Sequence, residues 1–316
     1  MGAQSLSSRA VIGSYYRKLN ENTGMAWAGA VSMPFDSDQA SEEYRWLGMA
    51  PQMREWLGGR LAKGLRDNGV IIKNKYFEAT LEVLVEEIRR DKTGQVMVRI
   101  NDLARRTNSH WVSLLSTLII AGETTGLAYD GQLFFDTDHV EDDSGVQSND
   151  ITVATVSPGT ATAPTASDFE RAILRGAETI LGQKDNQGEP MNEDASRFLV
   201  MVPTVFMSVA SAALKNPVIS NPSGTGAQTN TLVNLGGFGF DLAINPRLTW
   251  TTKFAMFRTD SDTKPFIRQE EQGVRMDAVA EGSEEEFKNR RHLYGVTASR
   301  NVGYGLWQDA VLVTLT

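Results

Sequence analysis

The chain has 316 residues, and 41% of them are hydrophobic, enough to bury a sizeable core in one large domain or two smaller ones. Its formal net charge of −8 and pI near 5.1, with no block of Lys or Arg, argue against a protein held on nucleic acid mainly by phosphate contacts. The absence of cysteine excludes disulfides, thiolate metal sites and a cysteine nucleophile, and no apolar run is long enough to span a membrane, so we predict a soluble protein that is not exported.

Residues 1–50 mix short helical fragments with glycine, proline and a polar run at 36–39. This pattern predicts an extended arm with little core of its own. The arm is nevertheless rich in aromatic residues, among them Tyr15, Tyr16 and Trp27. Large apolar groups outside a core usually pack on another surface, so we expect these side chains to contact a neighbouring subunit.

Residues 51–91 read as a long hairpin. The half from Phe77 to Glu86 alternates apolar and polar residues as a strand with one covered face does, and Asn68-Gly69 is a tight-turn dipeptide in the other half. Residues 51–75 carry six basic and two acidic side chains, whereas 76–91 carry five acidic and two basic ones. Opposite charges favour pairing of the two halves. A ribbon of this length is only marginally stable alone, so we expect it to rest on another surface.

A long helix is predicted over 95–122. Apolar residues recur on one face for about seven turns of 3.6 residues, from Val96 through Ile100 and Leu115 to Ile119. Arg99 and other polar residues occupy the opposite face, and Gly122 ends the helix.

The second half of the chain begins after a linker-like loop at 141–166. We predict a helix from Ser167, where Glu170 three residues on suggests a capping box, and a second box of this kind at Ser283 and Glu286. The remaining predictions are strands at 197–202, 238–244, 254–258, 294–300 and 306–315, a helix after Pro203, and a loop at 216–230. From Lys264 the chain becomes more polar.

Catalytic constellations are scarce. The best candidate is a cluster of carboxylates and one imidazole, made of Asp136, Asp138, His139, Glu141, Asp142 and Asp143. Such a cluster could hold a divalent cation, and it leaves a metal-dependent hydrolase using Asp138 and His139 as an alternative, although the spacing matches neither an EF-hand nor an HExxH helix. Lys63, Lys73 and Lys75 could donate to an isopeptide bond, but no partner asparagine is evident. We predict no cofactor, no metal and no enzymatic activity.

Several short motifs together resemble the major head subunits of Mu-like tailed bacteriophages. They are Trp56 to Arg60, Asn74 to Glu78, Tyr129-Asp130-Gly131 with Leu133-Phe134 and His139, and Tyr304 to Ala310. Each motif is weak alone, but their joint order is fairly specific.

The resemblance implies an α+β fold of the Hong Kong 97 type. Its parts would be an N-terminal arm (1–50), an E-loop that lies over a neighbouring subunit (51–91), a peripheral domain with a spine helix at 95–122 (92–160 and 258–316), and an axial domain (161–257). Within this scheme His139 would be structural. The expected inter-subunit contacts are Tyr15, Tyr16, Trp27, Trp56, Arg60, Lys63, Arg66, Lys73, Lys75, Glu78, Glu82 and Glu86.

The resemblance also implies a function. Hexamers and pentamers of this chain would form an icosahedral head around double-stranded DNA, contacted non-specifically, with a separate scaffolding protein and with portal and decoration proteins as further partners. The chain would be found in the virion, after assembly in the bacterial cytoplasm. A cellular nanocompartment shell of the encapsulin type is an alternative with the same fold.

Overall fold

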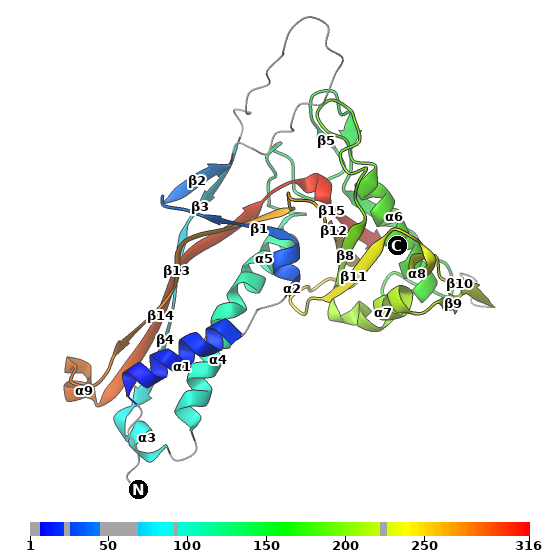
Figure 1. Ribbon diagram of the computed structural model, residues 1–316. Coiled ribbons are helices and arrows are strands. Elements are labelled where there is room, and N and C mark those ends of the chain that lie inside the picture. The colour runs from blue at the N-terminus through cyan, green and yellow to red at the C-terminus, as the bar shows by residue number, and fades with distance from the viewer. Residues whose placement is uncertain (1–6, 22–25, 45–68, 92–93, 222–225) are drawn as a thin grey trace, which may run out of the picture.

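The computed structural model describes residues 7–21, 26–44, 69–91, 94–221 and 226–316. Two β-sheets organise this part of the chain, and Figure 1 shows them extending in different directions from a shared centre. One sheet is short and has five strands, and the other has four strands, two of them long.

The five-stranded sheet has the order β11-β8-β12-β15-β7. Its strands are β11 (Gly239–Ile244), β8 (Arg197–Val202), β12 (Lys253–Arg258), β15 (Ala310–Leu315) and β7 (Asp150–Val153). The helices α6 (Ala166–Leu181), α7 (Met207–Lys215) and α8 (Thr231–Asn234) cover one face and share a hydrophobic cluster with it. Both faces of β8 are buried, which explains its continuous apolar sequence Phe-Leu-Val-Met-Val.

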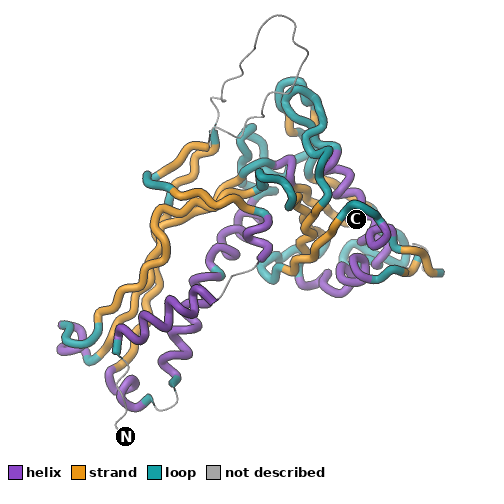
Figure 2. Tube along the Cα trace, in the orientation of Figure 1, coloured by secondary structure: helices purple, strands orange, loops and turns teal. Residues whose placement is uncertain are grey.

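The four-stranded sheet has the order β1-β13-β14-β4. Its strands are β1 (Ser32–Asp36), β13 (Phe266–Val279), β14 (Arg291–Tyr304) and β4 (Lys75–Leu84). Helices α1 (Ser8–Glu21) and α4 (Gln95–Asn108) pack on one face of this sheet, where Tyr15 and Ile100 meet Tyr294 and Val296. Figure 2 shows the long strands running alongside these helices, away from the five-stranded sheet. Two short helices, α3 (Val85–Arg90) and α9 (Glu284–Asn289), lie at the far end.

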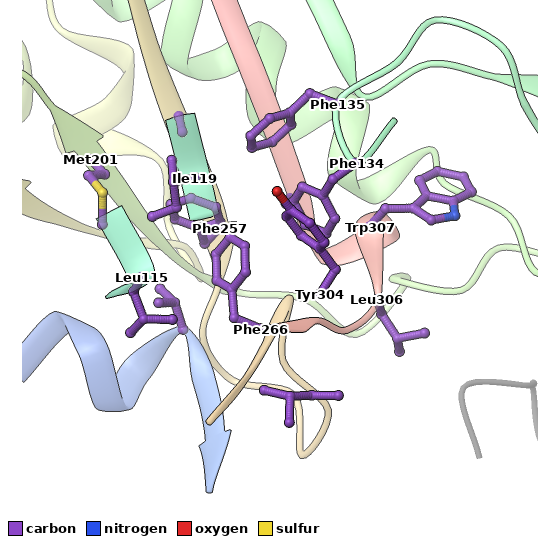
Figure 3. Packing of buried hydrophobic residues seen from close by; sticks show 14 of the residues in the cluster. Leu115, Ile119, Phe134, Phe135, Met201, Phe257, Phe266, Tyr304, Leu306 and Trp307 are labelled. Atoms are coloured by element: carbon purple, nitrogen blue, oxygen red, sulfur yellow. The ribbon is translucent and has the colours of Figure 1, made fainter. Parts of the chain in front are cut away.

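A central hydrophobic cluster joins the two sheets (Figure 3). Helix α5 (His110–Ala121) contributes Leu115 and Ile119, which lie near Phe257 of β12. The ring of Phe134 stacks on that of Tyr304, with centroids 4.7 Å apart. Because this cluster includes residues from both sheets, the two halves of the molecule share one continuous core.

The smaller elements connect these layers. They are α2 (Ala26–Ala30), β2 (Ser41–Tyr44), β3 (Val70–Lys73), β5 (His139–Val140), β6 (Val146–Gln147), β9 (Val218–Ser220), β10 (Ala227–Thr229) and the 3-10 turns Thr204–Phe206 and Trp307–Asp309.

The predicted pairing of the hairpin halves is wrong in the part that the structure describes. β3 pairs with β2 of the N-terminal segment, and β4 pairs with β14. The acidic side chains accordingly find partners on or beside β14, where Glu82 pairs with Arg291 (3.0 Å) and Glu86 with Arg290 (2.5 Å). The strand also ends at Leu84, since α3 begins at Val85.

The prediction of an arm without a core is also wrong. Tyr15 is fully buried, and its hydroxyl donates to Thr107 of α4 at 3.1 Å. The Tyr16 hydroxyl accepts from the backbone N–H of Met276 at 2.9 Å, and Trp27 is buried in the central cluster. These three side chains therefore stabilise their own subunit, because the surfaces that they cover belong to the same chain.

The predicted long helix is present, with an interruption at Ser109 that separates α4 from α5. The Ser109 hydroxyl donates to the carbonyl of Arg106, and such back-bonding often bends a helix. The buried face also shifts here, because Val112 and Ser116 are buried although the periodic pattern did not include them. Each half thus faces a different cluster, α4 the one under the long sheet and α5 the central one.

Three further predictions need correction. The long strand β13 occupies part of the polar stretch after Lys264, where the residue pattern predicted no strand, and β9 and β10 form a hairpin within the loop predicted at 216–230. The last strand, β15, lies between β12 and β7 in the five-stranded sheet. The capping box of α6 is formed by Thr165 and Asp168, two residues before the predicted pair.

Two connecting segments, 259–265 and 305–309, run side by side between the sheets, and we call them the joint. The Gly305 N–H donates to the carbonyl of Pro265 at 2.8 Å, and a Cβ at Gly305 would lie 2.4 Å from the Lys264 carbonyl oxygen. Asp309 is fully buried at the joint, beside Arg258, Asp260 and Lys264. Burial raises the pKa of Asp309 to about 7, although Arg258 opposes the shift.

Replacing Asp309 with asparagine should stabilise the folded subunit more at pH 8 than at pH 5. The folded-state pKa is raised, so ionisation of Asp309 opposes folding, and this cost grows between the ordinary pKa near 4 and pH 7. The stabilisation that the substitution produces should be larger at pH 8 than at pH 5 by an amount on the order of 2 kcal/mol, since one pKa unit corresponds to about 1.4 kcal/mol. Urea unfolding of the unassembled subunit at both pH values measures it, and an equal effect at both would contradict a raised pKa.

Candidate assembly surfaces

The Asp136–His139 cluster does not form a metal site. His139 is fully buried, its Nδ1 lies 2.6 Å from Asp130 Oδ2, and its ring stacks on Trp307 at a centroid distance of 3.9 Å. Asp138 is exposed, so these two side chains do not share an accessible site. Within the described ranges, no three His, Asp or Glu side chains are grouped as metal ligands would be. The geometry gives His139 a structural role, as the resemblance implied.

A groove with a volume of about 200 Å³ lies between α4 and the strands β4 and β14, and we call it the α4 groove. Apolar side chains provide most of its lining, namely Phe77, Ala79, Leu103, Val296 and Ala298. The Phe77 ring packs edge-on against His110, with centroids 4.4 Å apart. The groove forms because β4 is the edge strand of its sheet and α4 covers it only in part.

The floor of the α4 groove carries a buried positive charge. The Arg300 guanidinium donates to His110 Nδ1 and to the Thr107 carbonyl, both at 3.1 Å, and it lies 4.7 Å from the centre of the Trp111 ring. Burial is the main cause that lowers the pKa of His110 to about 4, and the charges of Arg300 and Arg247 contribute to the same shift, so the imidazole accepts this bond as a neutral ring. The ion pair of Arg300 with Glu270 is long, at 4.0 Å, which leaves the groove electropositive.

The tip of the β13–β14 hairpin exposes an aromatic side chain. Helix α9 begins after Ser283, whose hydroxyl accepts from the Glu286 N–H, which is one half of the predicted capping box; the Glu286 carboxylate accepts from the Gly282 N–H instead of the Ser283 N–H. Phe287 in this helix is 88% exposed. Glu285, two residues before Phe287, forms an ion pair with Arg291, with 2.9 Å between its Oε2 and the Arg291 Nε. Phe287 was not among the predicted contact residues, although it is the one phenylalanine within the charged run Glu-Glu-Glu-Phe-Lys-Asn.

The remaining predicted contact residues fall into two groups. Lys73, Lys75 and Glu78 are exposed on β3 and β4, and Tyr76 between them is 76% exposed. The other group lies outside the described residues and consists of Trp56, Arg60, Lys63 and Arg66. The structure therefore brings Lys75 and Glu78 to the free edge of the long sheet and the same side of the molecule as the α4 groove.

None of the described helices combines the length and the apolar character that crossing a bilayer requires.

One family model matches most of the chain. The model of the Mu-like prophage major head subunit gpT matches residues 9–175 and 245–315. The matched ranges include the N-terminal segment, the long helix, β12 and the whole of the long sheet.

Two curated proteins are similar to this chain over a part of its length. The FluMu major head subunit of the Mu-like prophage of Haemophilus influenzae is 36% identical over 103 residues, which are 33% of this chain and 33% of that protein. The major capsid protein of Escherichia phage Mu is 31% identical over 109 residues, 34% of this chain and 35% of that protein. The chain thus spans about a third of the length of the curated relatives that it matches.

The fold is similar to that of a solved phage capsid. The match is to a chain in the procapsid of bacteriophage JBD30, with a TM-score of 0.54 and 24% identity, and it covers 97% of this chain and 74% of that chain. The α+β fold is therefore of the Hong Kong 97 type, as the sequence motifs predicted.

Proposed function

The chain belongs to the Mu-like prophage major head subunit gpT family, and we propose that it is a major capsid protein that self-assembles into the icosahedral head of a tailed bacteriophage. The observation that carries this proposal is the family match to residues 9–175 and 245–315, on a fold that capsid proteins share. The two curated relatives bear the names of head and capsid subunits, which favours a phage head over a cellular nanocompartment.

The shape of the subunit supports assembly. The long sheet extends away from the five-stranded sheet, and the helices of the described chain leave one of its faces and the free edge of β4 uncovered. An exposed strand edge and exposed apolar side chains such as Tyr76 and Phe287 are features that proteins usually cover with a partner. Copies of the same chain would provide that cover in a shell.

The finer parts of the proposal concern the composition of the head. We propose that hexamers and pentamers form a closed shell around double-stranded DNA, with a separate scaffolding protein during assembly and with portal and decoration proteins in the finished particle. The net charge of −8 supports a wall that contains DNA rather than binds it through many phosphate contacts. Assembly would take place in the bacterial cytoplasm, and the product would be the virion. We propose no enzymatic activity for the chain.

We also propose which part of the capsid fold each segment of the chain forms. Residues 51–91 would form the E-loop, 92–160 and 258–316 the peripheral domain, and 161–257 the axial domain around the capsomer axis. The exposed side chains of Lys73, Lys75 and Glu78 would contact neighbouring subunits.

Electron microscopy of the purified native particle tests the proposed function, together with denaturing gel electrophoresis of the same sample. We expect closed icosahedral shells whose main band has the mass of one chain, 34.7 kDa. If the chain forms only small particles of discrete size, even when a scaffolding protein from the same genome is co-expressed, the proposal is wrong.

A further inference from the structure

We propose that Phe287, at the tip of the β13–β14 hairpin, docks into the α4 groove of a second copy of this chain. This inference rests on the proposed shell-forming function and names one contact within the shell. It commits to a second copy as the occupant, because the two surfaces match in both their apolar and their charged parts.

The apolar parts are complementary in size. Phe287 is 88% exposed, so nearly its whole ring is available to a partner. The α4 groove, about 200 Å³ in volume, is lined by Phe77, Ala79, Leu103 and other apolar groups, and it has room for one aromatic side chain. Burial of an aromatic ring in such a groove is a typical anchor of a protein interface.

The charged parts have opposite signs. Helix α9 carries Glu284, Glu285, Glu286 and Lys288, so its net charge is −2. Helix α4 carries three arginines and one aspartate, so its net charge is +2, and Arg106 on its exposed side borders the groove. The groove lining contains one acidic residue, Glu78, and two arginines, Arg106 and the buried Arg300, so its net charge is +1. An acidic helix bearing an exposed Phe is therefore the kind of partner that the groove would attract.

The two surfaces cannot meet within one chain. The groove residue Ala298 lies seven residues along β14 from Arg291, where α9 joins the strand, and this separation is roughly 23 Å at 3.3 Å per residue. Helix α9, which carries Phe287, lies at the far end of the long strands (Figure 1). A contact between two different surfaces of identical chains is heterologous, and such contacts close into rings when the rotation between copies allows it. A shell contains such rings.

A disulfide cross-link tests the contact, and the chain contains no cysteine that would give a background reaction. Phe287→Cys is combined with Ala79→Cys, which lines the groove from β4 and is exposed. In assembled shells under oxidising conditions, we expect dimers and larger ladders on a non-reducing gel, because a disulfide requires Cα atoms about 4.4–6.8 Å apart. The matched control combines Phe287→Cys with Val98→Cys, an exposed position on α4 away from the groove, and it should give no ladder.

The outcomes separate the two proposals. If shells form and the groove pair does not cross-link, or cross-links no more than the Val98 pair, the docking contact is wrong and the shell function stands. If the unsubstituted chain forms no shells, the proposed function fails and the contact fails with it.

A second variant covers the case in which cysteine at position 287 itself prevents assembly. Phe287→Ala should reduce the yield of shells several-fold, whereas Val279→Ala, an exposed apolar residue on the same hairpin, should leave it unchanged. Both positions are exposed, so the unassembled subunits should unfold at the same urea concentration as the unsubstituted chain. Equal shell yields from the two variants would contradict the inference.

Discussion

Replacing Tyr15 with alanine should destabilise the unassembled subunit by about 3–5 kcal/mol, the usual cost of removing a large buried aromatic side chain. The Tyr15 ring has no exposed surface, and its hydroxyl donates to Thr107. Its loss should also release α1 from α4, because Tyr15 and Val11 are the two buried residues of that helix. Urea unfolding measures the stability, and limited proteolysis of the folded subunit detects cleavage within α1.

Tyr76→Ala is the control, since it removes the same side chain from a position that is 76% exposed. Its effect on stability should lie within about 0.5 kcal/mol. If the two substitutions have similar effects, or if α1 resists protease in the Tyr15 variant, then α1 does not depend on its contact with α4.

The same contact explains why the sequence predicted a loose arm. The partners of α1 are Thr107, 92 residues away, and Met276, 260 residues away from Tyr16. A local sequence pattern cannot identify a contact partner that lies so far away along the chain. The sequence did indicate that the aromatic residues of the N-terminal segment pack on another surface, but it could not say that this surface belongs to the same chain.

Strands with a regular sequence pattern were predicted, among them β8, β12 and the alternating β4, whereas β13 was missed. β8 and β12 lie inside the five-stranded sheet and have continuous apolar sequences. β13 has one uncovered face, and its pairing with β14 shifts register near Gln272. These shifts interrupt the alternation of apolar and polar residues, so the sequence of β13 shows a polar stretch without the pattern of a strand.

The sequence allows two different start points for helix α6. Thr165 with Asp168 and Ser167 with Glu170 both fit the capping-box pattern. The structure selects the first pair, and Glu170 instead accepts a hydrogen bond from the Gln228 side chain at 3.0 Å. Tertiary contacts thus decided between two local solutions of similar quality.

The candidate surfaces were only partly predictable. The motifs identified the family, and the charges of β4 marked one exposed strand. The α4 groove, by contrast, combines Phe77, Leu103 and Arg300, which three separate elements bring together. The exposure of Phe287 likewise depends on the whole fold, since a capped helix with one aromatic residue usually buries that residue against a sheet.

The joint between the sheets depends on a single buried cation. Arg258 at the end of β12 is almost fully buried and donates to Asn192 (2.9 Å), Asp194 (2.7 Å) and Asp260 (2.8 Å). Burial alone would raise the pKa of Asp260, but hydrogen bonds from Arg258 and Ser196 outweigh it and lower that pKa to about 2. Arg258 therefore ties the chain that leaves β12 to the loop that enters β8.

Replacing Arg258 with alanine should cost about 3–5 kcal/mol of stability, because it leaves Asp260 and Asn192 without their buried partner. It should also increase protease cleavage within 259–265, since these residues lose their anchor. The matched control is Arg275→Ala, which removes an exposed pair with Asp277, and such pairs contribute at most about 1 kcal/mol. Urea unfolding of the unassembled subunits compares the two variants. Equal effects would mean that the central hydrophobic cluster, rather than the ion pairs of Arg258, fixes the joint.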